Sequence, residues 1–231
     1  MNPGRILVAL TALALIGACS DSTQPDGTTG DVQGLVVDAR GVPVPDATVV
    51  LEYATDASVP GSADKPSTVI DFELVEPGPA TLWIGSYCDA DTVRMLLDGT
   101  LPAGQHTLAW NGADDADREL PDGVYWYHLV TATREIRHAF VLLHHGYSGF
   151  TADAAPAPLV VTDARGRFAL GQGCLPFDHI NDLTDEAGNV IGTFTLTRRV
   201  RVWAFGGTVG MSDWVTVDPQ RGVAVTVRLG K

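Results

Sequence analysis

Basic residues are scarce in this 231-residue chain. Lys and Arg number 15 against 28 Asp and Glu, which gives a formal net charge of −13. A surface this acidic repels phosphate backbones, so the composition excludes nucleic acid as a partner and argues against docking on anionic lipid by charge alone. Motifs of catalysis are also lacking, since neither G-x-S-x-G nor H-E-x-x-H occurs. The sequence therefore predicts a protein that is not an enzyme and has no cofactor.

Long apolar runs are missing except near the start of the chain. Residues 6–16 are almost unbroken apolar sequence, which is too short to span a bilayer. Arg5 precedes this run, and the small residues Gly17 and Ala18 follow it. A basic start, an apolar middle and a small-residue end are the three parts of a secretory signal. Residues 1–18 are therefore predicted to be a signal peptide.

The end of this signal, Ile-Gly-Ala-Cys at residues 16–19, resembles a bacterial lipobox. The resemblance implies cleavage before Cys19 and acylation of Cys19, and two or more acyl chains would anchor the protein stably in a membrane. Ser20, and not Asp, follows Cys19. Resemblance to the common sorting pattern of bacterial lipoproteins therefore favours the outer membrane over retention in the inner membrane. A plain signal peptide with an incidental Cys is the alternative. Residues 19–30 form the predicted flexible tether, because residues 20–30 contain no apolar side chain.

Glycine (25 residues) and proline (14) are plentiful in the rest of the chain, which favours many short strands joined by turns. The predicted fold class is all-β. Apolar and polar residues alternate in the clearest of these segments, as they do in half-buried strands. The expected strands include residues 69–74, 80–87, 93–97, 105–110, 124–131, 136–143, 193–205, 213–217 and 222–229.

Residues 31–53 carry the pattern G-x-V-x-D-x-x-G-x-P-x-x-x-A-x-V-x-L. They resemble the opening of the carboxypeptidase regulatory-like domain, a transthyretin-like β-sandwich. A second part of that family's pattern, T-D-x-x-G-x-F-x-L, occurs at residues 162–170. The resemblance implies one sandwich split into residues 31–65 and 149–231. The matching positions of the opening are Gly34, Val36, Asp38, Gly41, Pro43, Ala47, Val49 and Leu51.

Residues 66–148 interrupt that domain and carry a different pattern. L-x-A-G-x-H-x-x-x-W-x-G, an acidic loop and G-V-Y-x-Y resemble the immunoglobulin-like module of the flagellar hook-capping protein. The resemblance implies an inserted β-sandwich without enzymatic activity. The matching positions are Leu101, Ala103, Gly104, His106, Trp110, Gly112, Asp114, Asp115, Gly123, Val124, Tyr125 and Tyr127.

Cysteine is rare, with three residues in all. If Cys19 is lipidated, Cys88 and Cys174 admit one pairing in an oxidising compartment, and that disulfide would tie the insert to its host. Two free thiols are the alternative. A nucleophile formed by Cys174 and His179 is conceivable, but no feature of the sequence indicates an activated thiol.

Several clusters of carboxylate and imidazole side chains are candidate metal sites, but the sequence predicts no metal. Asp-rich turns are commoner than calcium loops, and His144 and His145 would point to opposite faces of a strand. His128 and His138 are expected to face each other across a hairpin for packing rather than for zinc. The acidic candidates are Asp114, Asp115 and Asp117 in one loop, and Asp178, His179, Asp182, Asp185 and Glu186 in an extra loop within residues 174–191.

Aromatic side chains, 7% of the chain, suggest either a sugar-stacking platform or sandwich core, and core is favoured. The predicted function is that of a non-catalytic, lipid-anchored cell-envelope protein with a structural, adhesive or protein-interaction role. A carbohydrate- or peptide-binding subunit and an accessory factor of a peptidase or hydrolase are the alternatives. The expected partners are the membrane, through Cys19, and a protein or glycan of the envelope. The aromatic candidates are Trp83, Trp110, Trp126, Trp203, Trp214, Tyr125 and Tyr127.

Overall fold

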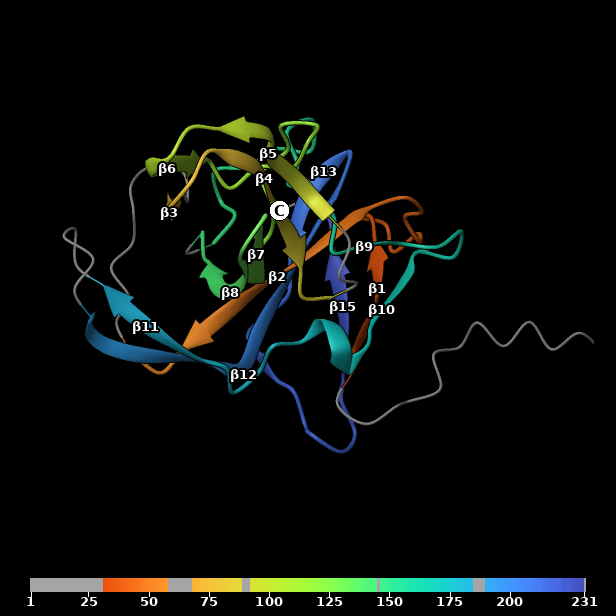
Figure 1. The fold of residues 1–231 in the computed structure, drawn as a ribbon. Coiled ribbons are helices and arrows are strands. Elements are labelled where there is room, and N and C mark those ends of the chain that lie inside the picture. The colour runs from red at the N-terminus through yellow and green to blue at the C-terminus, as the bar shows by residue number, and fades with distance from the viewer. Residues whose placement is uncertain (1–30, 58–67, 89–91, 145, 185–189, 231) are drawn as a thin grey trace, which may run out of the picture.

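A computed structural model describes residues 31–57, 68–88, 92–144, 146–184 and 190–230 of the chain (Figure 1). These residues form fifteen strands and one short 3₁₀ turn, Gln172–Cys174, which confirms the all-β prediction. None of the described residues belongs to a helix long and apolar enough to cross a membrane. The predicted signal peptide, the tether and Cys19 lie outside the described residues.

Strands β3 to β8 follow one another along the chain and, among the described residues, pair only with each other. They form a two-stranded sheet of β3 and β6 and a four-stranded sheet in the order β5-β4-β7-β8. We call these strands the central group. Their bounds are β3 Thr68–Leu74, β4 Gly78–Ser86, β5 Thr92–Leu101, β6 Gly104–Trp110, β7 Gly123–Thr131 and β8 Glu135–Leu142.

The remaining strands, the flanking group, come from both ends of the described chain. One sheet has the order β10-β1-β15, and the other has the order β11-β12-β2-β9 with β13 and β14 also paired to β12. Strands β1 and β15 run parallel and lie next to each other in Figure 1. The bounds are β1 Val32–Val37, β2 Thr48–Thr55, β9 Val160–Val161, β10 Arg167–Leu170, β11 Ile180–Thr184, β12 Val190–Gly206, β13 Thr208–Met211, β14 Val215–Thr216 and β15 Val223–Arg228.

Each group is a β-sandwich around its own core, and strand β3 shows why. Ile70, Phe72 and Leu74 are buried, while the residues between them are exposed, because successive side chains of a strand point to opposite faces. These three side chains pack with Leu82 and Ile84 of β4 in the central core. The flanking core is built in the same way from alternating residues of β1, β2, β12 and β15.

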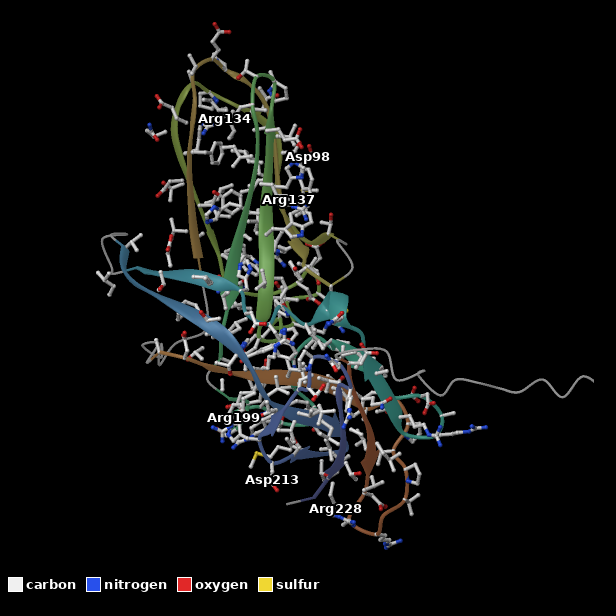
Figure 2. All side chains as sticks on the ribbon, turned by 90° about the horizontal axis from the view of Figure 1, so that it is seen from below. Asp98, Arg134, Arg137, Arg199, Asp213 and Arg228 are labelled. Atoms are coloured by element: carbon white, nitrogen blue, oxygen red, sulfur yellow. A yellow bond between two sulfur atoms is a disulfide. The ribbon has the colours of Figure 1, made fainter. Side chains whose placement is uncertain are left out.

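The two cores meet at one end of the central group. Val124 of β7 and Val141 of β8 pack into the flanking core, so the four-stranded sheet rests on the flanking group. Tyr147 packs with Val50 and Trp203 in a third cluster nearby. Figure 2 shows the resulting elongated molecule, with the central group at one end and the flanking group at the other. The residues labelled at the central end are Asp98, Arg134 and Arg137, and those at the flanking end are Arg199, Asp213 and Arg228.

Asp-x-Arg-Gly turns recur where the flanking strands connect. Asp38 Oδ1 accepts the backbone N–H groups of Arg40 and Val42, both at 2.8 Å. Asp163 Oδ1 does the same for Arg165 and Arg167, again at 2.8 Å. The hydrogen bond from the Arg167 N–H, followed by that from Arg165, lowers the pKa of the Asp163 carboxyl. The same short sequence therefore builds the same turn twice, and the carboxylate is its acceptor.

Strand ends differ from the prediction at several places. β5 is longer and β14 is shorter than expected. The region 174–191, expected to be an extra loop, contains strand β11 instead. The reason is the length of β12, which spans 17 residues, of which Val190–Thr195 precede its pairing with β2. This leading part of β12 offers β11 a partner along its whole length.

Candidate functional site: a cleft between two strand edges

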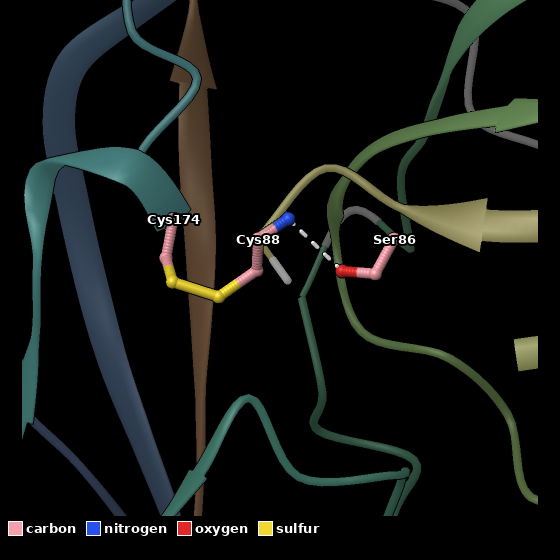
Figure 3. Close-up of a disulfide and its surroundings, with 3 residues drawn as sticks. All are labelled: Ser86, Cys88 and Cys174. Carbon is pink, nitrogen blue, oxygen red and sulfur yellow. Dashed lines mark hydrogen bonds between the residues drawn. A yellow bond between two sulfur atoms is a disulfide. The ribbon is translucent and has the colours of Figure 1, made fainter. Parts of the chain in front are cut away.

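A disulfide joins the two groups of strands (Figure 3). Cys88 follows β4 in the central group, and Cys174 ends the 3₁₀ turn of the flanking group, with Cα atoms 4.0 Å apart. The Cys88 backbone N–H donates to Ser86 Oγ at 3.0 Å, which fixes the turn after β4. The predicted pairing is therefore present. Because the Cys174 sulfur is bonded to Cys88, Cys174 cannot act with His179 as a nucleophile while the disulfide is intact.

A buried carboxylate, Asp122, is the second link between the groups. Asp122 lies in the turn before β7 and is 1% exposed. Its Oδ1 accepts the backbone N–H of His144 at 2.7 Å and lies 3.0 Å from His144 Nδ1. Its own backbone N–H donates to the Tyr147 hydroxyl at 2.5 Å. A buried carboxylate needs such donors, because burial without them is costly.

The Tyr147 hydroxyl carries this network into the flanking group. It donates to the Leu51 carbonyl of β2 at 3.3 Å, and the side chain is fully buried. Burial, and then the charge of Asp122, raise the pKa of the Tyr147 hydroxyl well above its ordinary value. The hydroxyl therefore stays protonated and can act as donor and acceptor at once. Next to it, Trp203 Nε1 donates to Glu52 Oε2 at 2.7 Å.

A cleft of about 600 Å³ opens where the two groups meet. One wall is β8, an edge strand of the four-stranded central sheet, and the other is β11, an edge strand of a flanking sheet. Figure 1 shows the two strands on the same side of the molecule. This volume falls in the range of ligand-binding pockets, about 300–1,000 Å³. The lining residues are His138, Ala139, Phe140, Val141, Leu142, His179, Ile180, Asn181, Asp182 and Phe194.

The ladder between β7 and β8 determines which backbone groups of β8 point into the cleft. The Thr131 N–H donates to the Arg134 carbonyl at 2.8 Å, which makes that pair hydrogen-bonded. Hydrogen-bonded and non-hydrogen-bonded pairs alternate along antiparallel strands. Counting from Arg134 along the register, Ala139 and Val141 belong to non-hydrogen-bonded pairs. Their N–H and C=O groups therefore point away from β7, toward the free edge.

The same reasoning applies to β11. The Leu196 N–H donates to the His179 carbonyl at 3.3 Å. The next pairs along the register are Ile180 with Thr195 and Asn181 with Phe194. Ile180, and by alternation Asp182, therefore point their backbone groups away from β12. Both walls of the cleft thus carry outward N–H and C=O groups that no described residue pairs.

The acidic loop of Asp114, Asp115 and Asp117 is held together by contacts within the chain. Asp114 Oδ1 accepts the backbone N–H groups of Ala116 and Arg118 at 2.9 and 2.8 Å, and Asp114 Oδ2 pairs with the Arg118 side chain. Arg94 reaches Asp117 at 3.0 Å. The Met95 backbone N–H donates to Asp115 Oδ1 at 3.2 Å, so each of the three carboxylates has a donor within the chain. Within the described ranges, no group of three or more metal-binding side chains occurs.

The second acidic set is dispersed. Asp178 pairs with Arg198 at 2.6 Å, whereas His179 and Asp182 line the cleft. Asp185 and Glu186 lie outside the described residues, as does His145.

The prediction that His128 and His138 face each other is wrong. His128 lies opposite Arg137, and His138 lies opposite Tyr127. The tight turn of the hairpin sets a register in which the two histidines are offset by one residue. His128 Nε2 instead contacts Glu135 Oε1 at 2.6 Å.

The tryptophans do not gather into one platform. Trp110 lies in the central core, Trp203 lies in the third cluster, and Trp83 and Trp126 lie on the outer face of the four-stranded sheet. Cations cover two of the rings: Arg137 lies over Trp126 at 4.2 Å, and Arg201 lies over Trp214 at 4.6 Å. The aromatic residues therefore serve packing at separate places, with Tyr125 beside Trp110 in the central core.

Sequence reasoning missed both the β11 edge and the Asp122–Tyr147 link. Asp122 stands in a Pro-Asp-Gly sequence that signals only a turn. Tyr147 stands in a glycine-flanked stretch without periodicity. A large aromatic side chain in such a stretch was the one available signal, because it must be buried against something. No family model matches the chain, and no curated protein matches it.

Proposed function

We propose that this chain is a non-catalytic protein of the bacterial cell envelope, anchored by lipid on Cys19, whose rigid β scaffold binds a protein partner. The observation that carries the proposal is the disulfide between Cys88 and Cys174. Disulfides persist in exported proteins and are rare in the cytosol, which agrees with the signal peptide expected at residues 1–18. The bond also keeps the two groups of strands in one relative position.

Fixed geometry is what a binding surface at the meeting of two groups requires. Cys174 stands six residues before Ile180, so the disulfide positions the β11 wall of the cleft. Val141, packed into the flanking core, positions the β8 wall. A preformed site avoids the ordering cost that a flexible one incurs on binding.

The proposed architecture follows the two family resemblances. Residues 31–65 and 149–231 form a carboxypeptidase regulatory-like domain, and residues 66–148 form an inserted hook-cap-type immunoglobulin-like module. The separate pairing of the central and flanking strands supports this division. Outer-membrane attachment, with the scaffold held off the bilayer by residues 19–30, completes the proposal.

Lipid anchoring is tested by comparing the full chain with a Cys19→Ser variant in a Gram-negative host. We expect the full chain to incorporate an alkyne-labelled palmitate and to sediment with outer membranes on a sucrose gradient. The variant should incorporate no label and appear in the soluble envelope fraction. Equal fractionation of the two, without label on either, would refute the anchor.

The interaction role is tested by crosslinking in living cells of the native species. A photoreactive residue in place of Asn181 probes the cleft, and the same residue in place of Gln220, in an exposed turn at the flanking end, is the matched control. We expect a discrete crosslinked protein at position 181 and none at 220. No crosslink from any of several exposed positions around the scaffold would refute a protein partner.

A further inference from the structure

We infer that the free end of the central group is a second contact surface, which binds an apolar side chain of a partner polypeptide flanked by basic residues. The inference rests on the proposed interaction function and names the chemistry of the partner. The surface is a groove of about 380 Å³ between two turns, one joining β3 to β4 and the other joining β7 to β8. Residues 73–79 line one side of this distal groove, and residues 131–134 line the other.

The register of the four-stranded sheet places the two turns next to each other. Strands β4 and β7 are neighbours, and Ala80 near the first turn pairs with Thr131 beside the second. Leu74, which lines the groove, is 6% exposed and belongs to the central core. The floor of the distal groove is therefore the end of that core, and the two turns are its rims.

Exposed apolar side chains are the first argument for a ligand. Val75 is 87% exposed, more than any other large apolar side chain of the described residues. Pro77, Pro79 and Ala132 line the same groove and are exposed as well. One exposed apolar residue is ordinary on a protein surface, whereas several around one concave surface are typical of a binding site. An apolar side chain inserted into the groove would remove Val75 from water.

Both rims keep their shape without a partner, which is the second argument. The Thr131 N–H donates to the Arg134 carbonyl at 2.8 Å, and the Thr131 hydroxyl accepts the Arg134 N–H at 3.0 Å. On the other rim, the rings of Pro77 and Pro79 fix the backbone φ angles. A preformed groove avoids the ordering cost that a flexible loop incurs on binding.

Charge determines which residues flank the inserted side chain. Glu73 and Glu76 on one rim are exposed and form no ion pair with another described residue. The net charge of −13 attracts a basic partner and repels a second copy of the chain. Lysine or arginine beside the apolar side chain would therefore pair with the two glutamates. Arg134, the one cation among the described residues that line the groove, lies on the opposite rim and can donate to backbone carbonyls of the partner.

The position of the distal groove suits a protein held by a tether. Residues 19–30, the expected tether, lead into the flanking group, where the Asp31 carbonyl accepts the Val223 N–H at 2.8 Å. Figure 2 shows Arg134 near the free end of the central group, away from the flanking group. The groove therefore lies on the group that the tether does not join, where a partner can approach it.

The test uses the full-length chain with Cys19→Ser, which we expect to be soluble, and a capped probe peptide, Gly-Lys-Leu-Lys-Gly. Nuclear magnetic resonance titration of the protein should show saturable shifts of the Val75 and Ala132 amide signals. Replacing the leucine of the probe by serine should weaken binding about tenfold, and replacing both lysines by glutamate should abolish it. Equal affinity for the three peptides, or no saturable shift at the groove, overturns the inference.

Two pairs of variants compare the groove with the rest of the surface. Val75→Ser should weaken probe binding about tenfold, whereas Val42→Ser, the same change at a valine of the flanking group that is 55% exposed, should change it less than twofold. Glu76→Gln should weaken binding about threefold, whereas Asp213→Asn, which removes one charge at the flanking end, should have no measurable effect. All four side chains are exposed, so the variants should fold. Equal affinities within each pair would place the probe outside the groove and refute the inference.

Crosslinking in living cells separates this inference from the proposed function. A photoreactive residue in place of Ala132 should crosslink to a discrete protein, and the added substitution Val75→Ser should abolish that crosslink. A partner crosslinked at Asn181 without probe binding at the groove would leave the interaction role standing and remove the groove as a contact surface. Absence of a crosslink at Ala132, or a product with twice the mass of the chain, which would identify a second copy as the occupant, also overturns the inference.

Discussion

Removal of the disulfide should destabilise this protein strongly. In the double variant Cys88→Ser/Cys174→Ser, the unfolded chain is no longer closed into a loop, whose ends are 86 residues apart in the sequence. The chain-entropy relation gives about 4.6 kcal/mol for a loop of that length at 25 °C. Domains are stable by only about 5–15 kcal/mol, so the bond contributes a large share. For a protein of this size, the loss corresponds to a melting temperature lower by roughly 9–18 °C.

Urea unfolding of the wild-type chain and of the double variant, in buffer without added oxidant or reductant, measures this loss. Tryptophan fluorescence follows both groups of strands, because Trp110 lies in the central core and Trp203 lies in the third cluster. The single variants Cys88→Ser and Cys174→Ser, and the wild-type chain treated with a reductant, are the controls and should match the double variant. A difference below about 1 kcal/mol between the double variant and the oxidised wild type would refute the entropic argument.

Three further substitutions test other contacts. Tyr147→Phe leaves the buried N–H of Asp122 without its acceptor and should cost about 1–3 kcal/mol in urea unfolding. Gly85→Ala should displace the ring of Trp126, because a Cβ at residue 85 would lie 2.0 Å from that ring; we expect a shift in tryptophan emission and a loss of about 1–3 kcal/mol. Asp163→Asn should weaken the acid dependence of unfolding, because folding lowers the pKa of the Asp163 carboxyl. The stabilisation from this carboxylate is present above its unfolded pKa of about 3.9 and is lost as the pH falls through the lower folded pKa.

The first two of these substitutions have a matched control variant, and the third is compared with the parent chain. Tyr125→Phe changes a tyrosine hydroxyl that donates to the Pro121 carbonyl, and it should leave the Asp122 N–H bonded. Gly99→Ala adds a Cβ where no atom lies within 4 Å, so it should be nearly neutral. For Asp163, unfolding free energies between pH 2 and pH 5 are compared with those of the parent chain. Parallel curves for variant and parent would contradict the account of the turn.

Local sequence signals predicted the parts of the fold that local physics determines. The alternation in residues 69–74 indicated a half-buried strand, and the structure buries Ile70, Phe72 and Leu74. The pairing of Cys88 with Cys174 followed from the count of cysteines and the expected compartment. Fold class and disulfide were therefore accessible from the sequence.

The candidate site was not accessible in the same way. Strand β11 has only two strongly apolar residues, Ile180 and Leu183, and their separation of three does not fit the alternation of a strand. The strand forms because β12 extends far enough to pair with it. The link between Asp122 and Tyr147 joins residues 25 apart, each in a segment that signals only a turn. The cleft itself exists because two sheets end near each other, and no local pattern encodes that proximity.

The parallel pairing of β1 with β15 has a consequence for how the chain folds during synthesis. Val32 pairs with Val223, so β1 cannot pair with β15 until nearly the entire chain has been synthesised. Strands β3 to β8 are contiguous and can collapse into their own sandwich much earlier. Non-local pairings slow folding, because the entropic cost of closing the loop comes before the contacts that offset it are formed. We therefore expect two kinetic phases, a fast one for the central strands and a slow one for the flanking strands, with β1 and β2 exposed to chaperones in between.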